Sequence, residues 1–361
     1  MPTIQERIRE IEQELKKTEY NKATEKHIGL LKAKLSRLET ELASHRKGGG
    51  EGFAIPKSGD ATVALVGYPN VGKSSLLNVL TDQKSETGNF AFTTLKVVPG
   101  ILNYKGAQIQ ILDLPGIIEN ASSGAGRGRE VLSIVRNADL VLLVTDVEAR
   151  GLERIVNELH RAGIVLNRRR KNISLKKGNS GGIRVHKPRK VDIDDDEIRN
   201  ILKEFKITNA DLFIRESVTF DDIIDYLKGN TVYASCVVAV NKTDLPYDES
   251  VLEPLKAFGP VVKVSAATGK GIEELKESIF KSLSLIRIYL KDKSGFVDLD
   301  RPMVLRSGST VQDVVRKINR EMLQSYRYAI LTGPNRKIGE QRVGIDFELL
   351  DGDTVTIISR N

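Results

Sequence analysis

A glycine-rich loop carries the strongest chemical signal in this sequence of 361 residues. Gly67 and Gly72 are separated by four residues and are followed directly by Lys73 and Ser74. Glycines let the backbone wrap around phosphate oxygens, and N–H groups at a helix start supply partial positive charge. In such loops the lysine reaches the β- and γ-phosphates and the serine hydroxyl binds Mg²⁺. The residues expected to bind a nucleotide here are Asn70, Val71, Gly72, Lys73, Ser74 and Ser75.

A second signal follows the apolar strand predicted at Gln108–Leu112, where Asp113 and Gly116 enclose a leucine and a proline. Open α/β sheets bind ligands at the carboxyl ends of their strands, so this position suits a metal and phosphate site. We expect Asp113 to hold Mg²⁺ through water and the Gly116 N–H to meet the γ-phosphate. Nucleotide switching also needs a mobile threonine that contacts Mg²⁺ and the γ-phosphate. We assign this role to Thr94 rather than Thr93.

Two further segments decide which base is bound. Asp244 ends the sequence Asn-Lys-Thr-Asp after an apolar strand, and its carboxylate can accept the N1–H and N2–H₂ protons of guanine. Adenine offers neither donor, and an unpaired buried carboxylate costs ~1–3 kcal/mol or more, so at least about tenfold to a hundredfold discrimination is expected. After another strand, the Ala266 N–H is expected to donate to guanine O6. The base-binding candidates are Asn241, Lys242, Asp244, Ser265 and Ala266.

Strands that alternate with helices surround these motifs and predict a doubly wound α/β domain. About seventy residues before residue 235 exceed a normal connection and predict an inserted α+β subdomain. The strands are expected at Ala61–Val66, Lys96–Tyr104, Ala107–Leu112, Leu140–Val144, Cys236–Val240 and Val261–Val264, and the helices at Ser74–Leu80, Leu152–Ala162 and Ile272–Leu283. The domains are expected at residues 1–57 (a helical hairpin and glycine-rich linker), 58–164 with 235–284 (the α/β domain), 165–234 (the insertion) and 285–361 (a C-terminal α+β module).

The flanking regions have patterns of their own. Apolar residues recur at helical spacing through residues 4–15 and 28–42, which predicts an antiparallel helical hairpin. In the insertion, Thr219 with Asp222 three residues later is typical of a helix N-cap. In the C-terminal module we expect a helix at Val311–Glu321 and strands at Ile286–Leu290, Asp346–Leu349 and Thr354–Ile358.

Composition narrows the class of protein. The formal charge of +8 and the pI of about 9.3 favour a polyanionic partner, although a highly charged soluble surface gives the same balance. Cys236 is the only cysteine, so no disulfide forms within the chain, and its apolar surroundings predict buried packing. Four scattered histidines receive no role. The sequence contains neither a long apolar run nor a signal-peptide pattern, so we expect a cytoplasmic location without a membrane partner.

The positive charge is concentrated in one block, from Arg168 to Lys190. Ten Lys and Arg and no Asp or Glu occur there, and an acidic stretch follows. A solvated loop beside a compensating acidic helix is one interpretation. The other, which we favour, is RNA binding by phosphate neutralisation, with a steep salt dependence. The block contains no aromatic stacking residues, so the sequence does not indicate specific reading of single-stranded RNA, and no DNA partner is expected.

The loop at residues 67–75, the Phe92–Leu95 segment and the Asp113–Ile117 segment resemble those of the Obg superfamily of GTPases. The whole layout is similar to the developmentally regulated GTP-binding protein (DRG) family. The resemblance implies a helical hairpin, a GTPase domain, an insertion resembling a ribosomal-protein domain, and a β-grasp-like TGS domain at residues 285–361. It also implies a possible DFRP-type partner protein, and the compact N-terminus suits an archaeal member. The TGS domain resembles a module tied to RNA or ribosomes.

The resemblance further implies a monovalent cation at the phosphates. Ile117 stands where many regulatory GTPases have a water-orienting glutamine, and an isoleucine cannot hydrogen-bond water. In this family pattern Asn70 coordinates K⁺, whose charge would stabilise the transition state much as an arginine finger does. The catalytic candidates are therefore Asn70, Lys73, Thr94 and Gly116, with Mg²⁺ and K⁺ as cofactors.

These observations lead to two functional hypotheses. The first is a slow, K⁺-stimulated GTP-hydrolysing switch that acts on ribosomes or translation. The alternative is a nucleotide-gated RNA-binding or ribosome-assembly adaptor whose hydrolysis is incidental. An ATPase is opposed by Asp244, because adenine lacks the protons that this carboxylate would accept.

Overall fold

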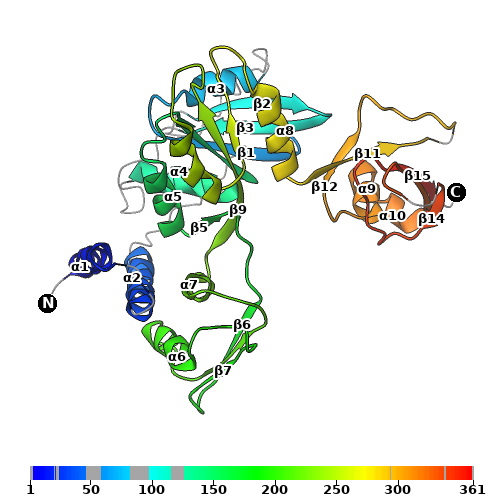
Figure 1. Ribbon diagram of the computed structural model, residues 1–361. Helices are drawn as coiled ribbons and strands as arrows, with labels where there is room; N and C mark the ends of the chain where they lie inside the picture. Colours follow the sequence, from blue (N-terminus) through cyan, green and yellow to red (C-terminus); the bar gives the residue numbers. More distant parts are fainter. Residues whose placement is uncertain are drawn as a thin grey trace. The chain divides into compact units, whose positions relative to one another are not determined.

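A computed structural model of the chain describes residues 3–19, 21, 24–45, 58–81, 97–114, 126–292, 294–336 and 339–359. These residues form two compact units (Figure 1). One unit contains residues 1–52 and 159–233, and the other contains residues 53–158 and 234–361. The expected glycine-rich linker at residues 48–52 lies outside the described residues, as do the segments 82–96 and 115–125.

A mainly parallel sheet forms the core of the larger unit. Its strand order is β10-β9-β4-β1-β3-β2, and β5 (Ile164–Leu166) pairs with β9 off this path. Every pair along the path is parallel except β2 with β3, which are antiparallel. The strands are β1 (Ala61–Gly67), β2 (Val98–Tyr104), β3 (Ala107–Asp113), β4 (Leu140–Asp146), β9 (Val232–Asn241) and β10 (Val261–Lys263). This arrangement confirms the predicted doubly wound α/β domain.

Helices cover both faces of this sheet (Figure 1). On one face, α3 (Lys73–Leu80) and α8 (Ile272–Ser282) share a hydrophobic core with alternate residues of the strands. On the other face lie α4 (Gly126–Asn137) and α5 (Leu152–Arg161). Neither α4 nor the 3-10 helix η1 (Glu249–Ala257) was predicted from the sequence. The glycines that begin α4 and the proline inside η1 weaken the helical pattern.

The smaller unit combines the N-terminal hairpin with the insertion. The hairpin helices α1 (Ile4–Lys17) and α2 (Glu25–His45) share a small apolar core. Helix α2 also packs on α6 (Asp195–Glu204) and α7 (Phe220–Lys228) of the insertion. The Lys32 ammonium lies 2.9 Å from the Asp221 carboxylate, and Ala33 belongs to the core of the insertion. The hairpin is therefore part of one folded body with the insertion.

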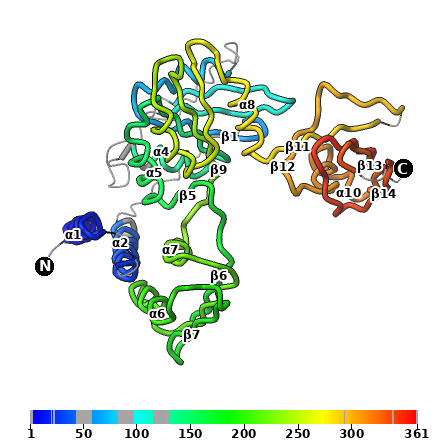
Figure 2. Tube along the Cα trace, viewed as in Figure 1, coloured from blue at the N-terminus to red at the C-terminus, as the bar shows by residue number. Residues whose placement is uncertain are grey.

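The insertion contains a three-stranded sheet with the order β6-β8-β7. Strand β6 (Ile173–Lys177) is antiparallel to β8 (Ala210–Ile214), and β7 (Ile183–His186) is parallel to β8. Figure 2 shows the chain leaving for this region after β5 and returning into β9. Helix α7 begins with a capping box in which Thr219 and Asp222 exchange hydrogen bonds, which confirms the N-cap prediction.

The C-terminal module has a five-stranded sheet with the order β12-β11-β15-β13-β14. The strands are β11 (Leu285–Leu290), β12 (Met303–Arg306), β13 (Tyr326–Thr332), β14 (Gln341–Val343) and β15 (Thr354–Ser359). Helix α9 (Val311–Ile318) supplies apolar side chains to the core of this sheet, and the short helix α10 (Met322–Ser325) follows it. The order of the strands and the helix between them make this a β-grasp-like module.

Two expectations about this module were wrong. The helix predicted to reach Glu321 ends at Ile318, because Asn319 adopts an extended conformation with φ of −159°. Residues 346–349 form no strand, and only an isolated bridge joins Glu348 to Thr310. Strands β12, β13 and β14 were not predicted. Strands β12 and β14 are too short to show a clear alternation of apolar and polar residues, whereas the alternating burial of β13 is a signal that was missed.

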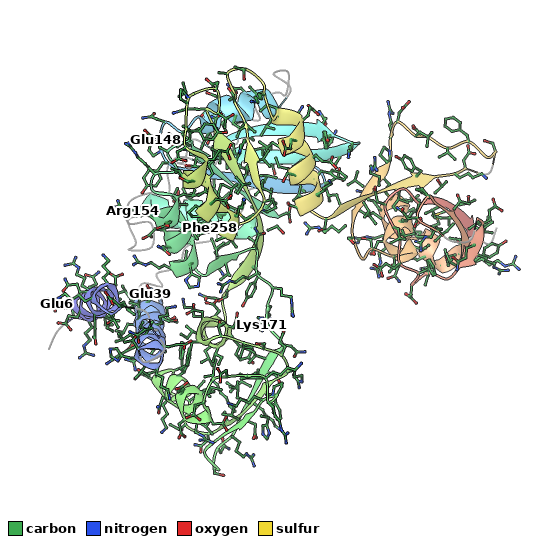
Figure 3. All side chains as sticks on the ribbon, viewed as in Figure 1. Glu6, Glu39, Glu148, Arg154, Lys171 and Phe258 are labelled. Carbon is green, nitrogen blue, oxygen red and sulfur yellow. The ribbon has the colours of Figure 1, made fainter. Side chains whose placement is uncertain are left out.

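A half-buried carboxylate on α2 makes the smaller unit sensitive to pH. Burial raises the pKa of Glu39 (labelled in Figure 3) above its ordinary value of 4.5, although Lys228 and Arg161 oppose this shift. The proton on Glu39 therefore stabilises the folded state fully below pH 4.5, and this contribution is lost as the pH rises through the higher folded-state pKa.

We predict that Glu39→Gln slows hydrogen exchange of the α2 amides at neutral pH, because the amide cannot ionise. The gain over the wild-type protein should disappear below pH 4.5, where the wild-type carboxyl is already protonated. Peptide-resolved hydrogen exchange at both pH values measures the difference. Faster exchange in the variant at neutral pH would show that the attraction to Lys228 and Arg161 outweighs burial.

Candidate nucleotide-binding site

The glycine-rich loop connects the end of β1 to the start of α3, as the sequence predicts. A Cβ atom at Gly67 would lie 2.2 Å from the Val144 carbonyl oxygen, so the close approach of β4 excludes any side chain there. Asn70 and Gly72 have positive φ angles of 65° and 89°, which let the loop turn back before the helix begins. The backbone therefore has the strand–loop–helix geometry that a phosphate-binding loop requires.

The Lys73 side chain points into this loop. Its ammonium donates to the carbonyl oxygens of Gly67 at 3.0 Å and Tyr68 at 2.8 Å. Burial lowers the pKa of Lys73, while the nearby Asp113 carboxylate opposes this shift. A positive charge is thus held at the centre of the loop where the sequence predicts the β- and γ-phosphates.

Two candidate magnesium ligands meet beside the loop. The Ser74 hydroxyl at the start of α3 donates to the Asp113 carboxylate at the end of β3, with an oxygen–oxygen distance of 2.5 Å. A hydroxyl and a carboxylate are the hard oxygen donors that suit Mg²⁺. No group of three His, Cys, Asp or Glu side chains that could hold a metal occurs among the described residues. A cation here would therefore complete its shell with phosphate oxygens and water.

The Asn241 side chain links the phosphate loop to the predicted base-binding loops. Its amide nitrogen donates to the Val71 carbonyl at 2.9 Å, and its amide oxygen accepts from the Ala266 N–H at 3.0 Å. The residue is only 3% exposed. A Cβ at Gly72 would lie 2.3 Å from the same amide nitrogen, so the glycine makes this contact possible.

The loop after β9 also reaches the phosphate loop through Lys242. This residue has a positive φ of 64°, and its ammonium donates to the Asn70 carbonyl at 2.7 Å. The Asp146 carboxylate lies 3.7 Å from the same ammonium. Asp146 was not predicted as a site residue, although its place at the carboxyl end of the buried strand β4 is a detectable signal.

The predicted guanine-binding carboxylate is held in its ionised form. A hydrogen bond from the Ser265 side chain is the main cause that lowers the pKa of the exposed Asp244 carboxyl. Ser265 is fully buried, and its hydroxyl also accepts from the Thr268 N–H at 3.2 Å. The Ala266 N–H is already bonded to Asn241, so donation to guanine O6 requires this proton to be shared or exchanged.

Most of the predicted site residues converge at the carboxyl edge of the sheet, at the ends of β1, β3, β9 and β10. The exceptions are Thr94 and Gly116, which lie outside the described residues together with Ile117.

Cys236 is buried in β9, and burial raises the pKa of its thiol to about 12. This confirms its predicted packing role. None of the described helices has the length and apolarity needed to cross a membrane.

The phosphate loop, its contact with Asn241 and the doubly wound sheet define a P-loop GTPase domain. Comparison with models of known protein families supports the assignment of a GTPase domain. Residues 62–177 match a model described as a 50S ribosome-binding GTPase, and residues 180–285 match the C-terminal region of that domain. Residues 286–359 match the TGS domain, which confirms the predicted C-terminal module.

Relatives match over nearly the whole chain. An uncharacterised GTP-binding protein of Methanocaldococcus jannaschii is 49% identical, covering 98% of this chain and 93% of the relative. Developmentally-regulated GTP-binding protein 1 of Xenopus laevis is 42% identical, covering 98% of each chain. Developmentally-regulated G-protein 3 of Arabidopsis thaliana is 43% identical over the full length of both. The chain belongs to the developmentally regulated GTP-binding protein family.

Solved structures give a weaker likeness. The G domain of the T. maritima FeoB iron transporter is 24% identical and covers 62% of this chain and 98% of that one, with a TM-score of 0.32. At this TM-score the likeness adds nothing to the family assignment, which rests on the sequence relatives.

We predict that Gly72→Ala and Asn241→Ala each weaken GDP binding strongly, because each breaks the contact between the two loops. The double variant should lose less than the sum of the two single losses, since removing the Asn241 amide also removes the clash with the new Cβ atom. A double-mutant cycle by isothermal titration with GDP measures this coupling. Strict additivity would show that the two residues act independently.

Proposed function

We propose that this chain binds GTP and hydrolyses it slowly to GDP and phosphate, acting as a nucleotide-dependent switch. The observation that carries the proposal is the chain of contacts from the phosphate loop through Asn241 to the loop before Asp244. These contacts connect the loop expected to bind the triphosphate with the Asp244 carboxylate, whose pKa is lowered by a hydrogen bond from Ser265. Membership of a family of GTP-binding proteins supports the choice of nucleotide.

In this proposal the described residues divide the work of binding and orientation. Lys73 holds the β- and γ-phosphates as a positive charge inside the loop. Ser74 and Asp113 hold Mg²⁺, which supplies charge neutralisation during phosphoryl transfer. The Val71 and Ser75 backbone N–H groups complete the phosphate cradle. We retain Thr94 and Gly116 as the proposed contacts to the γ-phosphate.

Asn70 is the residue we propose for K⁺ binding. It lies on the exposed tip of the loop, and its carbonyl oxygen accepts from the Lys242 ammonium. Among the described residues none forms a hydrogen bond with the Asn70 carboxamide. A carboxamide oxygen is a suitable donor for a hard cation. The bound cation would supply positive charge near the phosphates. An isoleucine at position 117 cannot orient water by hydrogen bonding, so this charge would take the place of a water-orienting side chain.

The role of Asp244 can be tested with inosine triphosphate, which lacks the 2-amino group of guanine. We predict that the wild-type protein binds GTP about tenfold to a hundredfold more tightly than ITP, and that Asp244→Ala removes most of this preference. Competition against fluorescently labelled GDP measures both affinities, with excess ATP as a third competitor. Equal binding of GTP and ITP by the wild-type protein would contradict the role of Asp244.

The role of Asn70 can be tested by exchanging the monovalent salt. We predict that K⁺ accelerates GTP hydrolysis relative to Na⁺ at equal ionic strength, and that Asn70→Ala loses this difference while still binding GDP. Initial rates of phosphate release in the two salts provide the measurement. Equal wild-type rates in both salts would remove the K⁺ proposal and leave GTP binding untouched.

We further propose a ribosome or RNA partner that contacts the basic block Arg168–Lys190 and the TGS domain. The family model that matches residues 62–177 carries a ribosome-binding description, which supports this choice. Part of the block is already neutralised, because Arg169 pairs with Glu216, Arg184 with Asp211 and Lys187 with Asp195. The Arg169 and Arg184 side chains are 73% and 68% exposed, so these two pairs contribute little stability and can exchange for phosphate. The Lys187 side chain is only 21% exposed and is held more firmly. A DFRP-type protein remains a proposed second partner, on the family resemblance alone.

A further inference from the structure

The open face of the insertion sheet brings aromatic and basic side chains together. Along β8, Leu212 and Ile214 point into the core shared with α6 and α7. Strand residues alternate between faces, so Asp211 and Phe213 lie on the opposite face, with Arg215 just beyond the strand. We call this side of the sheet, made of Ser174, Lys176, Arg184, His186, Asp211, Phe213 and Arg215, the outer face.

The register of the three strands arranges the outer face in two rows. In the first row Phe213 is paired with Ser174 of β6 on one side and with His186 of β7 on the other. In the second row Asp211 is paired with Lys176 of β6 and Arg184 of β7. One row is thus aromatic and the adjacent row carries mainly positive charge.

The aromatic row forms a two-ring stack. The rings of Phe213 and His186 are 4.6 Å apart between centroids and inclined by only 9°. Because β7 is an edge strand, the second face of the His186 ring points away from β8 toward the open edge of the sheet. The His186 side chain is 51% exposed, so this ring face is accessible to a planar ligand.

Cationic groups surround the stack. The Arg215 guanidinium carbon lies 5.9 Å from the Phe213 ring centroid, and the group also bonds to Asn172 and Ser174. The Arg184 side chain is 68% exposed while paired with Asp211. Lys176 is exposed in the same row. Stacking rings flanked by exposed cations match the two features of a single-stranded nucleic acid, its flat bases and its phosphates.

We propose that the outer face binds single-stranded RNA, with one unpaired base stacked on the free face of His186. The phosphates on either side of that base then contact Arg184, Lys176 and Arg215. The stacking proposal rests on the proposed RNA partner. It adds how the RNA is bound, which the positive charge of the basic block does not determine. The sequence interpretation that the basic block lacks stacking residues was wrong, because His186 lies within the block and its ring stacks on Phe213, which comes from a distant strand.

Binding of a fluorescein-labelled oligouridylate to the full chain, followed by fluorescence anisotropy, tests this proposal. His186→Ala should weaken binding roughly tenfold, as the loss of one base–aromatic stack does. His186→Phe should stay within about twofold of the wild type, because every base can stack on a phenyl ring. Phe213→Leu should also weaken binding, since it removes the ring that supports His186. Unchanged hydrogen exchange of the α2 and α6 amides in each variant shows that the unit carrying the substitutions is folded.

The charge contribution has its own matched control. Arg184→Ala should weaken binding and reduce its salt dependence, while Lys203→Ala, which removes an exposed cation from α6, should leave both unchanged. Duplex RNA of equal length should compete poorly, because its bases are already stacked.

The outcomes separate the two proposals. Salt-dependent wild-type binding that His186→Ala and Phe213→Leu leave unchanged overturns the stacking site and keeps the basic block as the RNA contact. If duplex RNA competes as well as single-stranded RNA of equal length, the stacking site is also overturned and the basic block is kept as the RNA contact. If the wild-type chain binds neither oligouridylate nor duplex RNA, the RNA partner fails together with this site, while the GTP site is unaffected.

Discussion

The hydrogen bonds of one buried amide, that of Asn241, hold the nucleotide site together. The amide group can donate and accept at once, and here it donates to the phosphate loop and accepts from the loop after β10. A buried polar group that loses a partner costs ~1–3 kcal/mol, so the two loops are strongly constrained to keep this distance. Gly72 is required because any side chain there would occupy the position of the amide. The spacing between the phosphate and base subsites is therefore set by this contact.

Strand β9 connects the end of the insertion directly to the nucleotide site. The chain leaves the insertion at β9, and the carboxyl end of β9 is Asn241 itself. Helix α2 of the hairpin contributes Ala33 and Lys32 to the packing of the insertion, so the hairpin and insertion form one folded body. A binding event on that body has a direct covalent route to the loop that binds the base.

The motifs of the nucleotide site were easier to recognise in the sequence than the strands of the C-terminal module, and the reason is physical. The phosphate loop and the Asn-Lys-Thr-Asp segment are short and local, and each follows a strand whose last six residues are all buried and easily recognised. The short strands β12 and β14 have no such pattern, and they form because β11 and β13 pair with them. The Asn241 bridge and the Phe213–His186 stack are contacts between segments far apart in the chain, so no local pattern reveals them. The roles of Thr94 and Gly116 stay predictions.

A nucleotide-dependent switch requires that this site hydrolyses GTP rather than only binding it. Single-turnover hydrolysis of γ-labelled GTP by the full chain, with Mg²⁺ and K⁺ and with or without ribosomes, tests this most directly. We expect slow phosphate release by the protein alone and a marked acceleration when ribosomes are added. Tight GTP binding with no phosphate release in either condition would contradict it, and would favour the nucleotide-gated adaptor.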